Sequence, residues 1–299
     1  MSLNFLMLGA QKSASTFIQH CLMTHPDVWM PREEISAFES PDYENGAVNA
    51  LFRRFGGRSE KIRGIKRPNY LCLPGIAERI KENTKTPKFL VVLRNPIDRT
   101  RSAYFHYAYG GFAPIIELNA GIEGILDGKL KSGWPRVEEI INFSMYGKGI
   151  ERFLAVFPPS SFMFITHDEV SQCPQNSLTR VCDFLDIDKC VNFGGLNRHP
   201  QSVIYSPQML RVAQFRNRIV YSYNNNRLRV EYRNPRFFWR SLSRLLKELE
   251  HLVLDRFYPA RKKPNFNQLL ESRLSELFAA DIEKTERLTG LDLSAWKSS

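Results

Sequence analysis

One short segment near the start of the chain constrains its fold more than any other: residues 9–16, with the sequence Gly-Ala-Gln-Lys-Ser-Ala-Ser-Thr. It follows an apolar run at residues 5–8 and precedes a helical pattern of apolar residues that begins at Phe17. This succession predicts a strand, a turn and the N-terminus of a helix. Such a turn points backbone N–H groups and the positive end of a helix at one spot, where an ammonium group and several hydroxyl groups also converge. We therefore predict an anion-binding loop with contacts from Gln11, Lys12, Ser13, Ala14, Ser15 and Thr16.

The loop is not the Walker loop of ATP-hydrolysing enzymes. That motif would need glycine where this chain has Leu6 and Gln11. The bound nucleotide is therefore not required to be a triphosphate. A P-loop nucleotide kinase, which is a phosphotransferase, stays open as the alternative enzyme class and predicts Mg²⁺-dependent binding of ATP.

Short apolar segments rich in β-forming residues alternate with helical patterns along the first two thirds of the chain. The expected strands lie at residues 5–8, 64–66, 88–93 and 161–166. The expected helices lie at about residues 16–24, 74–83, 97–108, 113–127, 136–156 and 168–186. This alternation predicts an α/β fold, namely a P-loop-like parallel β-sheet flanked by helices on both faces.

The character of the sequence changes at about residue 205, beyond which no further strand is expected. Two helical patterns follow, at about residues 236–256 and 267–289. We predict a single domain over residues 1–299. Its expected parts are an α/β core at residues 1–200, a C-terminal helical extension at about 205–265 and a last helix at about 266–290 that returns to the core.

The charge balance favours anionic partners. The 299 residues include 42 Lys and Arg against 31 Asp and Glu, a formal net charge of +11, which suits a nucleotide, a sulfated glycan, a nucleic acid or an acidic lipid. A nucleic-acid-binding protein is one alternative, but it leaves the phosphate-binding motifs unexplained, so we expect no nucleic-acid partner. The six histidines are not spaced in the sequence as metal ligands are, so we expect no metal site.

Two features bear on the cellular compartment. No apolar run reaches the roughly 18 to 20 residues of a membrane span, and the first strand begins too early for a signal peptide to precede it. We expect a cytoplasmic protein; the alternative is the lumenal catalytic domain of a membrane-anchored enzyme whose anchor is absent from this chain. The five cysteines have no metal-type pairing and are expected to be reduced, with a bridge between Cys182 and Cys190 as the one local disulfide left open.

A second informative segment starts where the apolar run at residues 88–93 ends. Arg94 lies at the expected carboxyl edge of the sheet, and Pro96 starts a helix at a position where its missing N–H group is harmless. Ser102 follows about two turns into that helix. A guanidinium group and a hydroxyl group in this arrangement are able to hold one phosphate together. Ligands of open parallel sheets bind beyond the carboxyl ends of the strands, where the first loop and Arg94 both lie.

Together the two motifs resemble those of the sulfotransferases that use 3′-phosphoadenosine 5′-phosphosulfate (PAPS). Their 5′-phosphosulfate loop reads Lys-Ser-Gly-Thr-Thr after a strand, and this chain has Lys-Ser-Ala-Ser-Thr at residues 12–16. Their 3′-phosphate motif has arginine, then asparagine or aspartate, then proline, with an arginine and a serine farther along the helix. The matching residues here are Arg94, Asn95, Pro96, Arg99 and Ser102. The resemblance implies an enzyme that uses PAPS, and no metal, to transfer a sulfuryl group to a hydroxyl group.

In its motifs the chain is most similar to the Golgi glycan and heparan sulfate sulfotransferases. Residues 25–38 are similar to the segment of those enzymes that carries the general base, which implies that role for Glu34. Residues 65–70 are similar to their Glu-Lys-x-Pro-x-Tyr segment, which places Lys66 on the lysine that helps to hold the sulfuryl group. The family often brings a basic loop over the nucleotide, which implies a cofactor contact for Arg198.

The chain departs from the family pattern at several positions. Ala14 replaces the usual glycine, which is costly if the backbone there needs a positive φ. Ser36 replaces a histidine of the glycan enzymes near the acceptor, so this departure bears on the acceptor rather than on the donor. The small-molecule cytosolic sulfotransferases use a histidine two residues after their equivalent of Lys66. Pro68 occupies that position here, which makes Glu34 the better candidate for the base.

Sulfuryl transfer requires a group that takes the acceptor proton and cations near the charge that builds up on the leaving phosphate. We expect Glu34 to be the general base, and Lys12 and Lys66 to stabilise the transferring group and the leaving phosphate. For Arg67, a role at the site and a structural role both stay open. The expected acceptor is a carbohydrate or another small metabolite.

Overall fold

The computed structural model describes residues 3–189, 204–223, 230–232 and 263–297. The chain divides into two compact units. The first unit consists of Met1–Arg99, Phe143–Pro200 and Leu277–Ser299, and the second of Thr100–Asn142 and Gln201–Glu276. The single domain that the sequence predicts over residues 1–299 stays a prediction.

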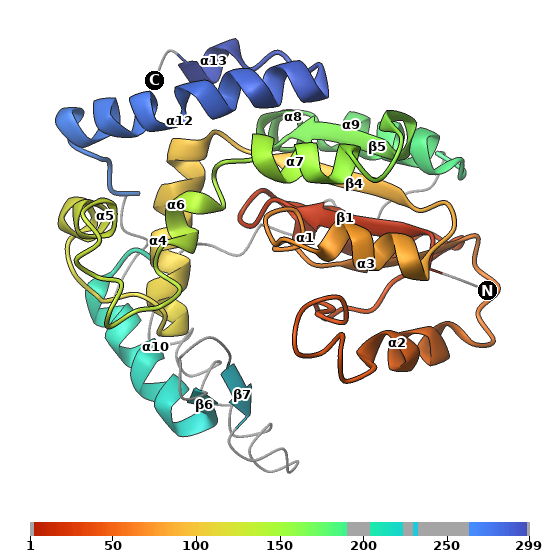
Figure 1. Ribbon diagram of the computed structural model, residues 1–299, viewed down its shortest axis with the longest axis horizontal. Helices are drawn as coiled ribbons and strands as arrows, with labels where there is room; N and C mark the ends of the chain where they lie inside the picture. Colours follow the sequence, from red (N-terminus) through yellow and green to blue (C-terminus); the bar gives the residue numbers. More distant parts are fainter. Residues whose placement is uncertain (1–2, 190–203, 224–229, 233–262, 298–299) are drawn as a thin grey trace. The chain divides into compact units, whose positions relative to one another are not determined.

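The first unit contains a five-stranded sheet in which neighbouring strands are parallel (Figure 1). Its strand order is β2-β3-β1-β4-β5. The strands are β1 (Phe5–Gly9), β2 (Val28–Trp29), β3 (Ile62–Lys66), β4 (Lys88–Leu93) and β5 (Phe162–Thr166). The central strands β1 and β4 are apolar runs that are buried almost throughout, as expected for a parallel sheet covered on both faces.

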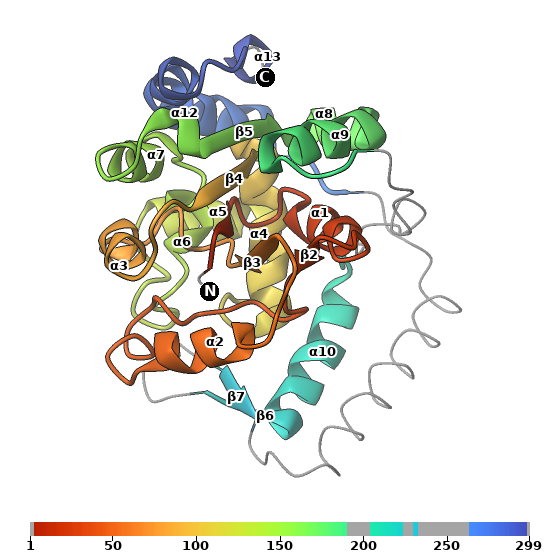
Figure 2. The same cartoon turned by 90° about the vertical axis from the view of Figure 1, so that its right-hand side faces the viewer.

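Helices cover both faces of this sheet, so the predicted fold class is confirmed (Figure 2). One face carries α1 (Ser15–Leu22), α8 (His167–Gln172) and α9 (Pro174–Leu185), and the other carries α3 (Ile76–Asn83) and α7 (Gly147–Leu154). On the first face, Met7 and Val92 of the strands belong to one hydrophobic cluster with Ile18 of α1. On the second face, the ring of Phe89 packs edge-on against that of Phe153, with ring centroids 5.7 Å apart.

Two elements of the first unit are missing from the sequence prediction, β2 and α2 (Ala47–Phe55). β2 has only two residues, which is too short for a periodic pattern to show. The helix α2 does carry a signal, because its buried residues Val48, Leu51 and Phe55 have the spacing of an amphipathic helix. The rings of Trp29 and Phe55 pack against each other with centroids 5.0 Å apart, which joins the two elements.

Two predicted helices are each divided in the structure, which corrects their boundaries. Residues 136–156 contain α6 (Glu139–Asn142) and α7, and residues 168–186 contain α8 and α9. The second division has a clear cause: Pro174 begins α9, and a proline lacks the N–H group that would continue α8. The helix predicted at 113–127 is also shorter, because α5 (Leu118–Leu126) begins only after its cap, Glu117.

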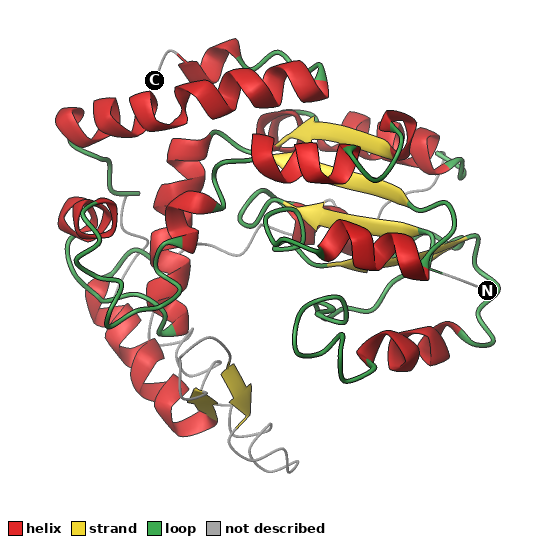
Figure 3. Ribbon diagram, in the orientation of Figure 1, coloured by secondary structure: helices red, strands yellow, loops and turns green. Residues whose placement is uncertain are grey.

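The second unit is mainly helical in the part that the structure describes (Figure 3). It contains α4 (Pro96–Gly110) from Thr100 onward, α5, α6, α10 (Pro207–Val220) and the start of α12 (Gln268–Thr289). It also contains two short antiparallel strands, β6 (Tyr221–Tyr223) and β7 (Val230–Tyr232). The expectation of no strand beyond residue 205 is therefore wrong, because a three-residue pairing is too short to be seen as an alternating pattern. The helix predicted at about 236–256 lies outside the described residues.

The end of α12 belongs to the first unit, together with α13 (Ser294–Lys297). Both carboxylate oxygens of Asp281 on α12 accept from the backbone N–H group of Gly147, at 3.1 Å each. The ring of Trp296 on α13 lies 6.4 Å from that of Tyr146. These contacts attach the last two helices to the segment that leads into α7.

Candidate active site

Three neighbouring strands end at one edge of the sheet of the first unit. β1 ends at Gly9, β3 ends at Lys66, and Arg94 follows the last residue of β4. The register pairs Met7 with Lys66 on one side of β1 and Gly9 with Val91 on the other. Parallel strands place their carboxyl ends at the same edge, where ligands of such sheets bind. The residues predicted to bind and react thus start from adjacent positions in the fold.

The loop between β1 and α1 has left-handed backbone at two positions. Lys12 has a φ of 70° and Ala14 a φ of 66°, and Ala14 directly precedes the first residue of α1, Ser15. Loops with such residues turn successive N–H groups toward one point and bind anions. The positive φ at Ala14 favours glycine, so the alanine at this position is strained.

The hydroxyl group of Ser13 in this loop is buried and has no hydrogen-bond partner among the described residues. Burying a hydroxyl group without a partner costs about 1–3 kcal/mol. An anion held by the loop would supply the missing acceptor. The neighbouring Ser15 is also buried, at the N-terminal end of α1.

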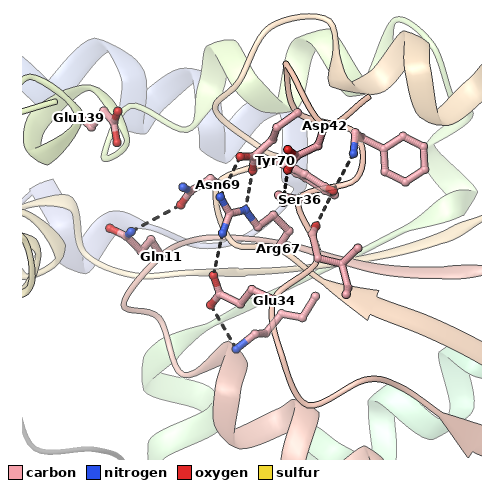
Figure 4. A network of polar contacts seen from close by, with 12 residues as sticks. Gln11, Glu34, Ser36, Asp42, Arg67, Asn69, Tyr70 and Glu139 are labelled. Atoms are coloured by element: carbon pink, nitrogen blue, oxygen red, sulfur yellow. Dashed lines mark hydrogen bonds and ion pairs between the residues drawn. The ribbon is translucent and has the colours of Figure 1, made fainter. Parts of the chain in front are cut away.

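Two arginines hold the loop through its oxygen atoms. Arg94 Nη1 donates to the carbonyl oxygen of Lys12 at 2.9 Å. The fully buried Arg99 donates from Nη2 to Gln11 Oε1 at 2.9 Å and from Nε to the Gln11 carbonyl oxygen at 3.3 Å. Gln11 in turn donates to Asn69 Oδ1 at 3.5 Å (Figure 4). The side chain of Gln11 and its carbonyl oxygen are thus both engaged within the protein.

Glu34 and Lys66 meet beside the start of α1, since Lys66 contacts both Glu34 and Thr16. Lys66 Nζ lies 3.4 Å from Glu34 Oε1 and donates to Thr16 Oγ1 at 2.7 Å. The side chain of Lys66 is 3% exposed, whereas that of Glu34 is 41% exposed. Burial lowers the pKa of Lys66 from its ordinary value, and Glu34 opposes this shift. The lysine is therefore fixed within the protein, while the carboxylate is open to a substrate.

A second cation reaches Glu34 from the residue next to Lys66. Arg67 Nη1 lies 3.3 Å from Glu34 Oε2. The same guanidinium group binds Glu39 with two nitrogens, Nη2 to Oε2 at 2.8 Å and Nε to Oε1. Both oxygens of Glu34 therefore face cations, and Arg67 is in direct contact with the candidate base.

The charge of Lys12 is strongly affected by this edge of the sheet. Burial, reinforced by the charges of Arg94 and Arg99 and opposed by Glu34, lowers the pKa of Lys12 to about 8. When cationic side chains lie close together and are partly buried, each of them makes the charged form of the others less favourable. Perturbed pKa values with a specific charge partner are typical of functional sites. The edge is thus an electropositive site that suits an anion.

Most predicted site residues of the first unit are joined by these contacts, namely Lys12, Thr16, Glu34, Lys66 and Arg94. Ser102 lies on the part of α4 that belongs to the second unit, and its buried hydroxyl group has no partner among the described residues. The joint hold of Arg94 and Ser102 on one phosphate stays a prediction. Arg198 lies outside the described residues.

Sequence reasoning missed two residues near this edge, Glu39 and His167. Leu93, the last residue of β4, pairs with Thr166, the last residue of β5. The residues that follow them, Arg94 and His167, therefore leave the sheet side by side. Burial and then Arg94 lower the pKa of His167. Its position directly after a predicted strand could have identified it, whereas nothing in the sequence pattern marks Glu39.

Comparison with known proteins agrees with this geometry. The model of the family described as "Sulfotransferase domain" matches residues 4–192. The match includes all five strands of the sheet, the loop after β1 and the segment with Glu34 and Lys66. The chain belongs to the sulfotransferase family. The family predicted from the two phosphate-binding motifs is therefore confirmed.

Relatives of this sulfotransferase match different shares of its length. It is 26% identical over 191 residues to human heparan sulfate glucosamine 3-O-sulfotransferase 6, across 62% of this chain and 53% of the relative. It is 31% identical over 105 residues to a membrane-associated sulfotransferase of Dictyostelium discoideum, across 34% of this chain and 22% of the relative. The chain spans about half the length of the heparan sulfate relatives that it matches.

A solved structure supports the fold of the sulfotransferase. The crystal structure of a sulfotransferase from Alicyclobacillus acidocaldarius superposes with a TM-score of 0.67 at 20% sequence identity. The superposition covers 99% of both chains. At this identity the likeness is evidence for the fold alone.

The structure also bears on membrane-spanning helices, on metal binding and on the cysteines of the sulfotransferase. Within the described ranges no helix is long and apolar enough to cross a membrane, and no three His, Cys, Asp or Glu side chains there are grouped to hold a metal ion. Cys182 is a buried thiol whose pKa burial raises to about 11, and Cys190 lies outside the described residues. The predicted cytoplasmic location finds no support among the relatives, one of which is named as membrane-associated.

Proposed function

We propose that this sulfotransferase transfers a sulfuryl group from PAPS to a hydroxyl group of a carbohydrate or another small metabolite. The observation that supports PAPS as the donor is the structure of the loop after β1. Its left-handed residues, the buried Ser13 hydroxyl group without a partner in the described part of the chain, and the lowered pKa of Lys12 all favour a bound phosphate. When bound, PAPS supplies an activated sulfuryl group and leaves as 3′-phosphoadenosine 5′-phosphate (PAP).

The residues of the two motifs suit a donor with two phosphate groups. We assign the 5′ group to the N–H groups of the loop and to three hydroxyl groups, those of Ser13, Ser15 and Thr16. The 3′-phosphate is assigned to Arg94 and Ser102, since guanidinium and hydroxyl groups are both donors to phosphate. The assignment of Arg198 as a further cofactor contact rests on the motif alone.

Glu34 takes the proton of the acceptor hydroxyl group in this proposal. The acceptor oxygen forms a bond to sulfur while the bond between sulfur and the 5′-phosphate oxygen breaks, and the proton ends on the Glu34 carboxylate. Lys66 contacts both Glu34 and Thr16, so its ammonium group is available between the base and the phosphate loop. Together with Lys12 it stabilises the negative charge that builds up on the leaving phosphate.

For the acceptor we favour a glycan. The human relative is named for heparan sulfate, and the net charge of +11 of this chain favours anionic molecules. For the location, the alternative of a lumenal catalytic domain is the one that fits a relative named as membrane-associated.

Titration calorimetry with PAP, with ATP plus Mg²⁺ and with adenosine 5′-phosphate tests the proposed donor. We expect PAP to bind most tightly, because only PAP offers both a 5′- and a 3′-phosphate. Binding of PAP that equals or is weaker than that of ATP plus Mg²⁺ would overturn the donor assignment in favour of a P-loop phosphotransferase.

A further inference from the structure

We propose that Glu39 is a positioning residue, which holds Arg67 so that this arginine does not capture the Glu34 carboxylate. The inference rests on the proposed role of Glu34 as the base. It concerns two residues, Arg67 and Glu39, that the proposed transfer step does not itself use. Arg67 contacts Glu34 directly (Figure 4), and Glu39 contacts Arg67.

The distances divide the guanidinium group of Arg67 unequally between two carboxylates. Glu39 accepts from Nε and Nη2, with Nη2 to Oε2 at 2.8 Å. Glu34 receives only Nη1, at 3.3 Å. A two-pronged pair of arginine and carboxylate is the stronger and more directional arrangement, so Glu39 determines where the guanidinium group points. Glu34 is left with a longer, weaker contact.

The carboxylates of Glu39 and Glu34 also differ in their exposure to water, and Glu39 is the more buried of the two. The side chains of Arg67 and Glu39 are 22% and 12% exposed, whereas that of Glu34 is 41% exposed. A pair away from water gains more from its charges than an exposed pair does. The inner pair therefore persists while Glu34 stays accessible.

Hydrogen bonds of the backbone fix the segment that carries Arg67 and the segment that carries Glu34 and Glu39. The N–H group of Arg67 donates to the carbonyl oxygen of Met7 in β1 at 3.0 Å. The N–H group of Ile35 donates to the Lys66 carbonyl oxygen at 3.1 Å, next to Arg67. The buried Tyr70 hydroxyl group donates to the carbonyl oxygen of Ile35 and accepts from the N–H group of Phe38 at 3.1 Å. The segments with Glu34 and Arg67 thus cannot easily separate, and an arginine released by Glu39 would have Glu34 as its nearest carboxylate.

Three cations face Glu34: Lys66, Arg67 and, through its charge, Lys12. Glu39 offsets the charge of one of the three. Without Glu39, the Arg67 guanidinium group is free to bind Glu34 with two nitrogens, which withdraws the carboxylate from the acceptor.

Four variants test this role: Glu39→Gln, Arg67→Met, the double variant, and Glu44→Gln as a matched control. Glu44 pairs with Arg79 at 2.8 Å in the same region but has no contact with Glu34. We expect Glu39→Gln to lower kcat roughly tenfold or more, with the affinity for PAP and the KM for the acceptor unchanged. The double variant should recover much of the lost kcat, since it also removes the released arginine, and Glu44→Gln should resemble the wild type.

A merely structural role predicts the opposite order, with the double variant as slow as Glu39→Gln or slower, and this result would overturn the proposal. Titration calorimetry with PAP identifies variants that have failed to fold. A crystal structure of Glu39→Gln gives a second answer that does not depend on turnover. Two nitrogens of Arg67 at about 3 Å from the Glu34 oxygens support the proposal, and an unmoved Arg67 contradicts it.

The crystal structure also separates this inference from the proposed function. A wild-type protein that transfers no sulfuryl group refutes the function. Movement of Arg67 onto Glu34 in Glu39→Gln would still establish the positioning role of Glu39.

Discussion

Raising the pH from 7 to 9 should weaken the binding of PAP through the side chain of Lys12. Burial, reinforced by Arg94 and Arg99, lowers the pKa of this lysine to about 8. A phosphate bound beside the lysine favours the ammonium form. The complex therefore keeps a proton that the protein without PAP loses above pH 8. Binding then takes up a proton, and the affinity falls as the pH rises.

The size of this effect follows from the pKa of Lys12. With a pKa of about 8, roughly nine in ten lysines are protonated at pH 7 and roughly one in ten at pH 9. If the bound lysine stays protonated throughout, the association constant falls about tenfold between pH 7 and pH 9, or about 1.4 kcal/mol. The phosphates of PAP contribute little, because phosphate monoesters lose their second proton near pH 6.

Titration calorimetry at pH 7, 8 and 9, in two buffers with different ionisation enthalpies, measures both the affinity and the protons taken up. Uptake should approach one proton per PAP above pH 8. Lys12→Arg is the matched control, because its guanidinium group stays charged throughout and its affinity should be nearly independent of pH. A wild-type affinity that does not change from pH 7 to pH 9, or an equal dependence in Lys12→Arg, would refute this reasoning.

Three further predictions concern single residues. Glu34→Gln should bind PAP normally but lose transfer by about 10²-fold to 10⁴-fold, while Glu33→Gln, whose carboxylate pairs with Arg54, should stay active; normal turnover in Glu34→Gln would remove that residue from its role. Arg94→Ala and Ser102→Ala should weaken the binding of PAP about tenfold or more and leave adenosine 5′-phosphate nearly unaffected in calorimetry; an equal loss for both nucleotides would contradict the 3′-phosphate assignment. Ala14→Gly should raise the free energy of unfolding by about 1 kcal/mol in denaturant titrations, since the φ of 66° favours glycine, and a decrease would show that the alanine is not strained.

The fold of the first unit could be predicted because its central strands are long and apolar. The runs at residues 5–8 and 88–93 were expected as strands and form β1 and β4. The two-residue β2 and the three-residue β6 and β7 could not be predicted in this way, since such short pairings leave no periodic pattern. The break between α8 and α9 could have been predicted from Pro174, which begins α9.

The candidate site was predictable where a residue ends a strand or follows it directly. Lys66 is the last residue of β3 and Arg94 follows β4, and the end of a parallel strand fixes its edge of the sheet. Glu34 lies in a loop, and only the resemblance to a family marked it. The ion pair between Arg67 and Glu39 could not be predicted, since the two residues are 28 positions apart in the sequence and only the folded chain brings them together.

Transfer of a sulfuryl group that depends on Glu34 is the activity proposed for this protein. The direct measurement uses sulfur-labelled PAPS with heparan sulfate and a panel of smaller hydroxyl compounds, and compares the wild-type protein with Glu34→Gln. We predict that the wild type labels at least one of these acceptors and that Glu34→Gln labels none at a comparable rate. Equal labelling by the two proteins, or the transfer of phosphate from ATP by a wild type that labels no acceptor, would contradict the claim.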